Sequence, residues 1–315
     1  MPEHLRRNFL PCDAATLERV EASIRQNYHT GWRAEASYSS EGYQRDLASH
    51  LTGRLNNDRG LIVPWLDTAR PLTGQHILEV GCGTGSSTLA LIEQGACVTG
   101  IDVDEGALAV ARERCSAYGV EAEFQELNAD NIATDFSPGS FDHIIFFAAL
   151  EHMTISERLA SLAAAWTVLP TGGLLTIIET PNRLWHYDSH TSLLPLFHWL
   201  PNELAFYYSR MSQRENFREL YREYDPDSKQ HFLRRGRGMS FHEIDLAIAP
   251  AVSLDVVSSL GREPRGGYTS ASQKFKAVMK DLIPSLHDGF FDEYIDIIIR
   301  KTDQPSTLPS QAETQ

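Results

Sequence analysis

Three glycines at alternate positions, Gly81, Gly83 and Gly85, are the residues whose type and spacing most clearly indicate a ligand site in this chain. They follow residues 76–80, an aliphatic run typical of a buried strand. Glycine has no Cβ, so it permits both a sharp turn and the close approach of a ligand to the backbone. Residues 86–88 are candidate helix N-caps. The stretch therefore predicts a strand, a ligand-binding glycine loop and a helix whose first amides point at the ligand.

A carboxylate ends the next predicted strand, residues 97–101. Asp102 follows the glycine loop by about 20 residues, the spacing at which an acidic residue accepts from ribose hydroxyls in dinucleotide sites. This pairing indicates a ligand of the adenosine type. Ser86 occupies the place of the third glycine in the dinucleotide pattern, and the loop lacks the lysine of a P-loop. A dinucleotide and a nucleoside triphosphate are therefore both disfavoured.

Residues 79–85, Glu-Val-Gly-Cys-Gly-Thr-Gly, resemble motif I of class I S-adenosylmethionine-dependent methyltransferases, and Asp102 resembles the acidic residue after their second strand. The later strands follow in the family's order, most clearly over residues 75–182. The resemblance implies that S-adenosylmethionine is bound and that S-adenosylhomocysteine is the product. The cofactor contacts that it implies are Glu79, Gly81, Cys82, Gly83, Gly85, Asp102, Val103, Asn128, Ala129 and Ala148.

The resemblance places a polar residue after the third strand to hold the adenine amino group. By position it is Asn128, or Asp130 if the loop is displaced, and the family more often has aspartate at the first of these. The Asn128 carboxamide oxygen can still accept from an amine, although as a neutral acceptor. The alternative is that these side chains only cap a turn.

An imidazole is expected at the edge where open α/β sheets bind ligands. His152 comes shortly after the continuous apolar strand at residues 143–147, so it lies near the predicted chemistry. It is a candidate general base. Similar Glu-His pairs occur in family members that act on different substrates. A structural or cofactor-positioning role for His152 is therefore the alternative.

Some sixty residues separate the fifth predicted strand from a helix at Ser240, which is too long for a plain connection. Residues 183–239 are rich in aromatic side chains, which favours a helical insertion that lines an acceptor pocket. The alternative is that these aromatics form a core of their own. His186 and His190 are further candidate bases. A metal held by His186, Asp188 and His190 is disfavoured, because methyl transfer to a nucleophilic oxygen needs positioning more than a Lewis acid.

The insertion is more basic than the acidic chain as a whole. An arginine fork pairs well with a carboxylate, so the insertion's arginines, Arg183 among them, are candidates for binding an acidic acceptor. The alternative is that the arginines spaced four residues apart form one solvated helix face paired with glutamates. The arginines are Arg183, Arg210, Arg214, Arg218, Arg222, Arg234, Arg235 and Arg237.

Periodicity along the chain predicts an α/β protein. Residues 1–72 read as a helical cap and residues 73–182 as a β-α-β core. Residues 240–302 complete that core, beginning with a helix that Ser240 and Glu243 would open as a capping box, and residues 303–315 read as a disordered tail. Together with the resemblance, this implies a Rossmann-like, seven-stranded, mostly parallel sheet with helices on both faces. The helical insertion at 183–239 would bind the substrate.

Composition limits the expected partners. A net charge of −14 repels phosphate backbones, so nucleic acid is not expected. The four cysteines lack the spacing of a metal site. The sequence shows neither a signal-peptide pattern nor an apolar run long enough to span a membrane. We expect a cytoplasmic protein, monomeric or homodimeric and without metal, that acts on a small molecule.

The function that these features predict is S-adenosylmethionine-dependent O-methylation of a small-molecule acceptor, with a preference for a carboxylic acid that would become a methyl ester. A carboxylate needs no general base near neutral pH, whereas a phenol or sugar hydroxyl needs a histidine to take its proton. One alternative is a non-catalytic subunit that binds the cofactor and uses the insertion as a protein interface. Another is a dehydrogenase on a related sheet.

Overall fold

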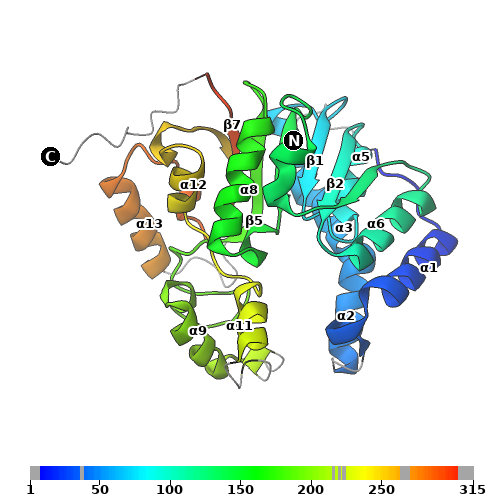
Figure 1. Ribbon diagram of the computed structural model, residues 1–315, viewed down its shortest axis with the longest axis horizontal. Coiled ribbons are helices and arrows are strands. Elements are labelled where there is room, and N and C mark those ends of the chain that lie inside the picture. Colours follow the sequence, from blue (N-terminus) through cyan, green and yellow to red (C-terminus); the bar gives the residue numbers. More distant parts are fainter. Residues whose placement is uncertain are drawn as a thin grey trace. The chain divides into compact units, whose positions relative to one another are not determined.

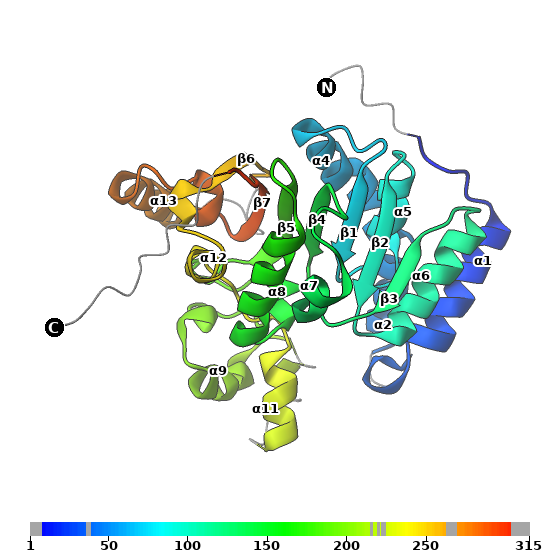
Figure 2. The same ribbon diagram turned by 45° about the horizontal axis from the view of Figure 1, so that its top comes forward.

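The computed structural model describes residues 8–35, 39–214, 217–218, 221, 225–262 and 270–303. The chain divides into two compact units, residues 1–145 and 146–315, and strand β4 (His143–Phe147) crosses the boundary. Seven strands form one mixed sheet in the order β3-β2-β1-β4-β5-β7-β6 (Figures 1 and 2). This order confirms the predicted Rossmann-like fold class.

The first unit contains the strand, glycine loop and helix predicted around residue 81. Its strands are β1 (His76–Val80), β2 (Cys97–Asp102) and β3 (Glu123–Glu126), and its core helices are α5 (Ser86–Ile92), α6 (Glu105–Ala117) and α7 (Ile132–Asp135), with a 3-10 turn η6 (Ala129–Asn131). β1 pairs in parallel with β2, and β2 pairs in parallel with β3. The loops after the three strands, which carry Gly83, Asp102 and Asn128, therefore share the carboxyl edge of the sheet.

Helices precede β1, as the sequence predicts. They are α1 (Ala14–Ser23), α2 (Ser40–Ala48), α3 (Arg54–Asn57) and α4 (Val63–Ala69), with π-helical turns at Ile24–Tyr28, Ser49–Gly53 and Asp58–Ile62. α1 begins after Asp13, whose side chain caps it, and lies beside α6 (Figure 2). Val20, Ile24, Tyr43 and Leu47 form a buried cluster with Val110 of α6. This cluster fixes the helical cap to the α/β part of the unit.

The second unit completes the sheet with β5 (Leu174–Pro181), β6 (Asp255–Ser259) and β7 (Tyr294–Arg300). β7 runs antiparallel to both β5 and β6. Its helical elements are η7 (Leu150–His152), α8 (Ile155–Val168), η8 (Phe197–Trp199), α9 (Asn202–Tyr208), η9 (Ser209–Met211), α11 (Pro226–Leu233), α12 (Phe241–Ala247), η10 (Ala251–Ser253), α13 (Ser270–Leu282) and η11 (Asp288–Phe291). No helix within the described ranges is long and apolar enough to cross a membrane.

The predicted capping box at Ser240 is wrong. Ser240 precedes α12, but its side chain makes no capping bond and lies instead 3.2 Å from Nδ1 of His242. Glu243 pairs with the buried Arg158 at 3.1 Å, and this ion pair takes the carboxylate away from the helix start. The second unit has a capping box at α8, between Thr154 and Glu157.

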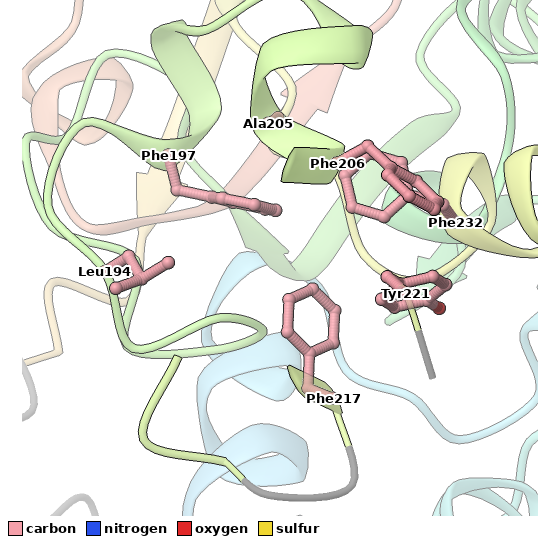
Figure 3. Close-up of a cluster of buried hydrophobic side chains, with 7 residues drawn as sticks. All are labelled: Leu194, Phe197, Ala205, Phe206, Phe217, Tyr221 and Phe232. Carbon is pink, nitrogen blue, oxygen red and sulfur yellow. The ribbon is translucent and has the colours of Figure 1, made fainter. Parts of the chain in front are cut away.

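The insertion has a hydrophobic core of its own. α9 and α11 lie side by side (Figure 1), and their aromatic side chains meet at its centre (Figure 3). The buried cluster consists of Leu194, Phe197, Ala205, Phe206, Phe217, Tyr221 and Phe232. The alternative reading of the aromatic residues thus holds for Phe197 and Phe206. Arg222 and the predicted tail from residue 304 lie outside the described residues.

Candidate functional site

The glycine loop has a backbone that side chains with a Cβ rarely adopt. The φ angles are 80° at Gly81, 51° at Gly83 and 74° at Gly85. The amides of Gly81 and Cys82 donate to the carbonyl oxygen of Ile101 at 2.9 and 3.2 Å, which ties the loop to β2. A Cβ added at Gly83 would meet no atom closer than 4.0 Å. The loop is therefore held in place while the space beside Gly83 stays open, as binding of a ligand to its backbone requires.

Asp102 lies directly against this loop. Its Oδ2 accepts from the amide of Gly83 at 2.9 Å, and its Oδ1 accepts from the amide of Asp104 at 3.0 Å. Burial raises the pKa of Asp102, although the two amides oppose that shift. Each carboxylate oxygen has a second lone pair with which it can accept from a ribose hydroxyl. The structure thus brings together the two features that the sequence associates with an adenosine ligand.

Glu79 and Cys82, two of the predicted cofactor contacts, have buried side chains. The Glu79 side chain is fully buried and accepts from the hydroxyls of Ser87 and Thr88 in the first turn of α5. Burial raises the pKa of Glu79 to about 7. The Cys82 side chain is also buried and packs against Gly100. Both side chains support the loop from inside the protein, so a ligand can reach only their backbone.

Two predicted contacts present side chains at the same edge. Val103, directly after β2, is 63% exposed, and its apolar side chain would suit the face of an adenine ring. Asn128 is exposed after β3, and its side chain makes no capping bond to the turn that follows. Ala129, by contrast, is buried. The side chains of Val103 and Asn128 are therefore accessible at this edge, and their contacts with adenine stay predictions.

We expect Asp102→Asn to weaken binding of S-adenosylmethionine by about 10- to 100-fold, because it keeps the size of the side chain and removes the charge-assisted acceptors. Calorimetric titration measures this loss. Asp142→Asn is the matched control, since Asp142 also accepts a backbone amide at 2.9 Å, from His76, at the amino end of β1. Equal affinities of the two variants would contradict the ribose assignment.

The sequence did not indicate a buried cluster behind the loop. Arg114 on α6 is fully buried, and its Nε donates to the carbonyl oxygen of Thr84 at 2.8 Å. The hydroxyl of Thr84 lies 3.3 Å from Nδ1 of His50. One signal was available: Arg114 follows Ala111 by three residues, so an arginine occupies the apolar face of its helix.

In the second unit, two residues other than glycine have a positive φ angle, in the left-handed region. They lie at the carboxyl ends of neighbouring strands. Ala148 has a φ of 47° after β4, and Glu179 has a φ of 59° near the end of β5. The Ala148 amide donates to the carbonyl oxygen of Ile178 at 3.0 Å, and the Glu179 amide donates to Oδ1 of Asp296 at 2.7 Å. Such strain is concentrated at functional sites in proteins. The backbone at Ala148 is thus compatible with its predicted cofactor contact, which stays a prediction.

His152 is half-exposed, and its imidazole is held through Nδ1. Its Nδ1 lies 2.8 Å from the carbonyl oxygen of Arg234, so Nδ1 carries the proton and Nε2 has the lone pair. Nε2 is 3.8 Å from Oε1 of Glu151. Burial raises the pKa of Glu151 to about 8, so this carboxyl group is protonated at neutral pH. The atom of His152 that can accept a proton is therefore Nε2.

Stability should fall as pH rises, because folded Glu151 holds its proton more tightly than the unfolded chain does. The loss extends from the ordinary pKa of 4.5 to the folded pKa of about 8. The loss of stability over this whole range is about 5 kcal/mol at most. Denaturant unfolding at pH 5.5 and 8.5 measures this difference. Glu151→Gln should make the dependence less steep, because only the part due to Glu151 is removed, and it should be more stable than the unchanged protein at the higher pH. A parallel pH dependence would contradict the assignment.

The other two candidate histidines have structural contacts. Nδ1 of His190 lies 2.9 Å from the Thr191 hydroxyl, which itself donates to the carbonyl oxygen of Gly236 at 2.8 Å. His186 is half-buried, with its ring centroid 5.5 Å from that of Trp185. Their roles as bases stay predictions.

Asp188 is not available to a metal ion. It is buried, its oxygens accept from the amides of His190, Thr191 and Ser192, and its Oδ1 lies 3.2 Å from Nε2 of His198. Burial alone would raise the pKa of Asp188, but these donors outweigh burial and hold the pKa below its usual value. Within the described part of the chain, no three His, Cys, Asp or Glu side chains are grouped for a metal. Asp188 therefore organises the loop that carries the histidines.

Three arginines of the insertion bond to other groups of the protein. Arg183 donates through Nε to the carbonyl oxygen of His198 at 3.1 Å. Arg234 forms a two-pronged ion pair with Glu157, at 2.6 and 3.0 Å. Arg237 is buried, donates to two carbonyl oxygens of the 197–200 segment and lies 5.0 Å from the ring centre of Phe197. These contacts give the carboxylate-binding interpretation of the arginines little support.

The strand order, the positive-φ glycine loop and the acidic residue beside it are features of the class I S-adenosylmethionine-dependent methyltransferases. Residues 77–173 match the family model described as a methyltransferase domain. Two similar proteins are the ubiquinone biosynthesis O-methyltransferases of Pseudomonas paraeruginosa and Pseudomonas putida, 34% and 35% identical over 129 residues. These alignments cover 41% of this chain and 54% of each relative, so the chain spans about half the length of the relatives it matches.

Among solved structures, a methyltransferase of Methanosarcina mazei described as S-adenosylmethionine-dependent is 19% identical to the chain, with a TM-score of 0.42. That comparison covers 73% of this chain and 93% of the other.

Proposed function

We propose that the protein transfers a methyl group from S-adenosylmethionine to a hydroxyl oxygen of a small molecule. The observation that supports the cofactor is the open space at Gly83 beside the Asp102 carboxylate. Bound S-adenosylmethionine would supply an electrophilic sulfonium methyl group. Asp102, Val103 and Asn128 would hold its adenosine part, and the backbone of residues 81–85 would lie against it.

The choice of a hydroxyl rests on His152. A hydroxyl must lose its proton as it attacks, and His152 is half-exposed with its lone pair on Nε2. Glu151, 3.8 Å from that nitrogen, would stabilise the imidazolium if it gave up its own proton at higher pH. The relatives' description as O-methyltransferases agrees with an oxygen acceptor. The carboxylic acid expected from the sequence has less support, because Arg183 and Arg237 bond within the insertion and Arg234 pairs with Glu157 of α8.

The test is a panel of matched phenols, aliphatic alcohols and carboxylic acids, with release of S-adenosylhomocysteine as the readout. We expect turnover with at least one hydroxyl compound. Tight cofactor binding without turnover on the whole panel would favour the non-catalytic partner subunit. Turnover confined to the acids would overturn the hydroxyl proposal and leave methyl transfer standing. We further propose a cytoplasmic monomer or homodimer that binds neither nucleic acid nor membrane, in keeping with the net charge of −14.

A further inference from the structure

Arg114 joins two backbone segments through three carbonyl oxygens. Besides the bond from its Nε to Thr84, Nη1 donates to the carbonyl oxygen of Leu51 at 3.0 Å and Nη2 to that of His50 at 2.6 Å. Thr84 belongs to the glycine loop, whereas residues 50 and 51 belong to the π-helical turn Ser49–Gly53 of the N-terminal cap. We infer that Arg114 is a positioning residue, which sets the glycine loop for cofactor binding by locking it to the cap. This inference rests on the proposed function.

The loop is held at Thr84 on both its backbone and its side chain. Arg114 fixes the carbonyl oxygen, and the hydroxyl lies 3.3 Å from Nδ1 of His50. All three residues are buried, with Arg114 fully so. Thr84 lies between Gly83 and Gly85, so movement of its peptide would rotate both glycines. The orientation of the amides that face the ligand therefore depends on a guanidinium that cannot itself touch the ligand.

The chemistry of the guanidinium explains why an arginine occupies this position. Burial lowers the pKa of Arg114 to about 10, so the group is still charged at neutral pH. A charged donor makes the stronger class of hydrogen bond, and the planar fork presents several N–H groups in fixed directions. Lysine keeps the charge but has a single nitrogen, so it cannot reach three separated carbonyl oxygens. The arrangement thus requires the fork and not only a buried cation.

The discriminating experiment compares Arg114→Lys with Arg112→Lys. Arg112 lies two residues earlier on α6, exposed to solvent and paired with Glu105 at 2.6 Å. We expect Arg114→Lys to weaken S-adenosylhomocysteine binding by about 10- to 100-fold in calorimetry. In turnover, KM for S-adenosylmethionine should rise more than kcat falls. The Arg112→Lys variant should match the unchanged protein both in its affinity for S-adenosylhomocysteine and in its turnover.

Amide hydrogen exchange without ligand gives a second readout. In Arg114→Lys, exchange should become faster both at residues 49–53 and at residues 81–85, whereas Arg112→Lys should change neither. If Arg114→Lys does not fold, Thr84→Val removes the contact with His50 at nearly constant volume and should weaken binding by about 3- to 10-fold. Unchanged affinity in a folded Arg114→Lys, or in Thr84→Val where it replaces that variant, would overturn the inference. Failure of the unchanged protein to bind S-adenosylhomocysteine would instead refute the proposed function. The exchange data would still test whether Arg114 connects the glycine loop to the N-terminal cap.

Discussion

Gly83→Val is expected to abolish measurable binding of S-adenosylmethionine while the protein stays folded. A loss of about 100-fold or more, equivalent to about 2.8 kcal/mol, is expected because the branched side chain would fill the space left for the ligand. The nearest protein atom to a Cβ at this position is 4.0 Å away, so the obstruction falls on the ligand and not on the protein. Calorimetric titration of the folded variant with S-adenosylmethionine measures this loss of affinity.

The matched control for this variant is Gly139→Val. Gly139 has a φ of 84° and no atom within 4 Å of its added Cβ, so it imposes comparable backbone strain at an exposed turn away from the loop. Both variants should lose similar stability in thermal unfolding, but only Gly83→Val should lose the ligand. If Gly139→Val weakened binding as much, the effect would be general destabilisation. Binding of ordinary strength by Gly83→Val would place the ligand elsewhere.

The fold could be predicted from the sequence because its signals are local. The aliphatic run of β1 is followed by Gly81, and Asp102 ends the apolar run of β2, so the residues at the end of each strand mark where it stops. The capping box failed for a reason that is not local. Glu243 is drawn away by Arg158, a residue 85 positions earlier in the chain.

The site could be predicted in part, and what was missed has a physical cause. The motif locates the loop, but β1 is buried on both faces, so its pattern does not say which way the Glu79 side chain points. Arg114 contacts Thr84 across 30 positions and His50 across 64, which no short-range periodicity encodes. Every residue has a carbonyl oxygen that an arginine can bind. The sequence alone therefore cannot distinguish an arginine that binds substrate from one that, like Arg237, binds carbonyl oxygens elsewhere in the protein.

The largest effect on turnover is expected at His152. Replacing it with alanine should slow methylation of a hydroxyl acceptor by roughly 10²- to 10⁴-fold, the usual contribution of a general base. S-adenosylhomocysteine binding should stay near its ordinary value. The unchanged enzyme should become faster with rising pH as the imidazole loses its proton, and the variant should lose that rise. Initial rates at saturating cofactor from pH 5.5 to 9 measure both effects.

The control separates the proton acceptor from a merely structural histidine. His76→Ala removes an exposed imidazole at the amino end of β1, away from the ligand edge, and should leave the rate unchanged. His186→Ala and His190→Ala should cost less than His152→Ala, because His190 is engaged with Thr191 and His186 packs on Trp185. Arg183→Ala and Arg234→Ala, assayed on matched acids and phenols, complete the comparison. Efficient methylation of acids that depends on an arginine and not on His152 would overturn the hydroxyl proposal, since an ionised carboxylate needs charge pairing and no base.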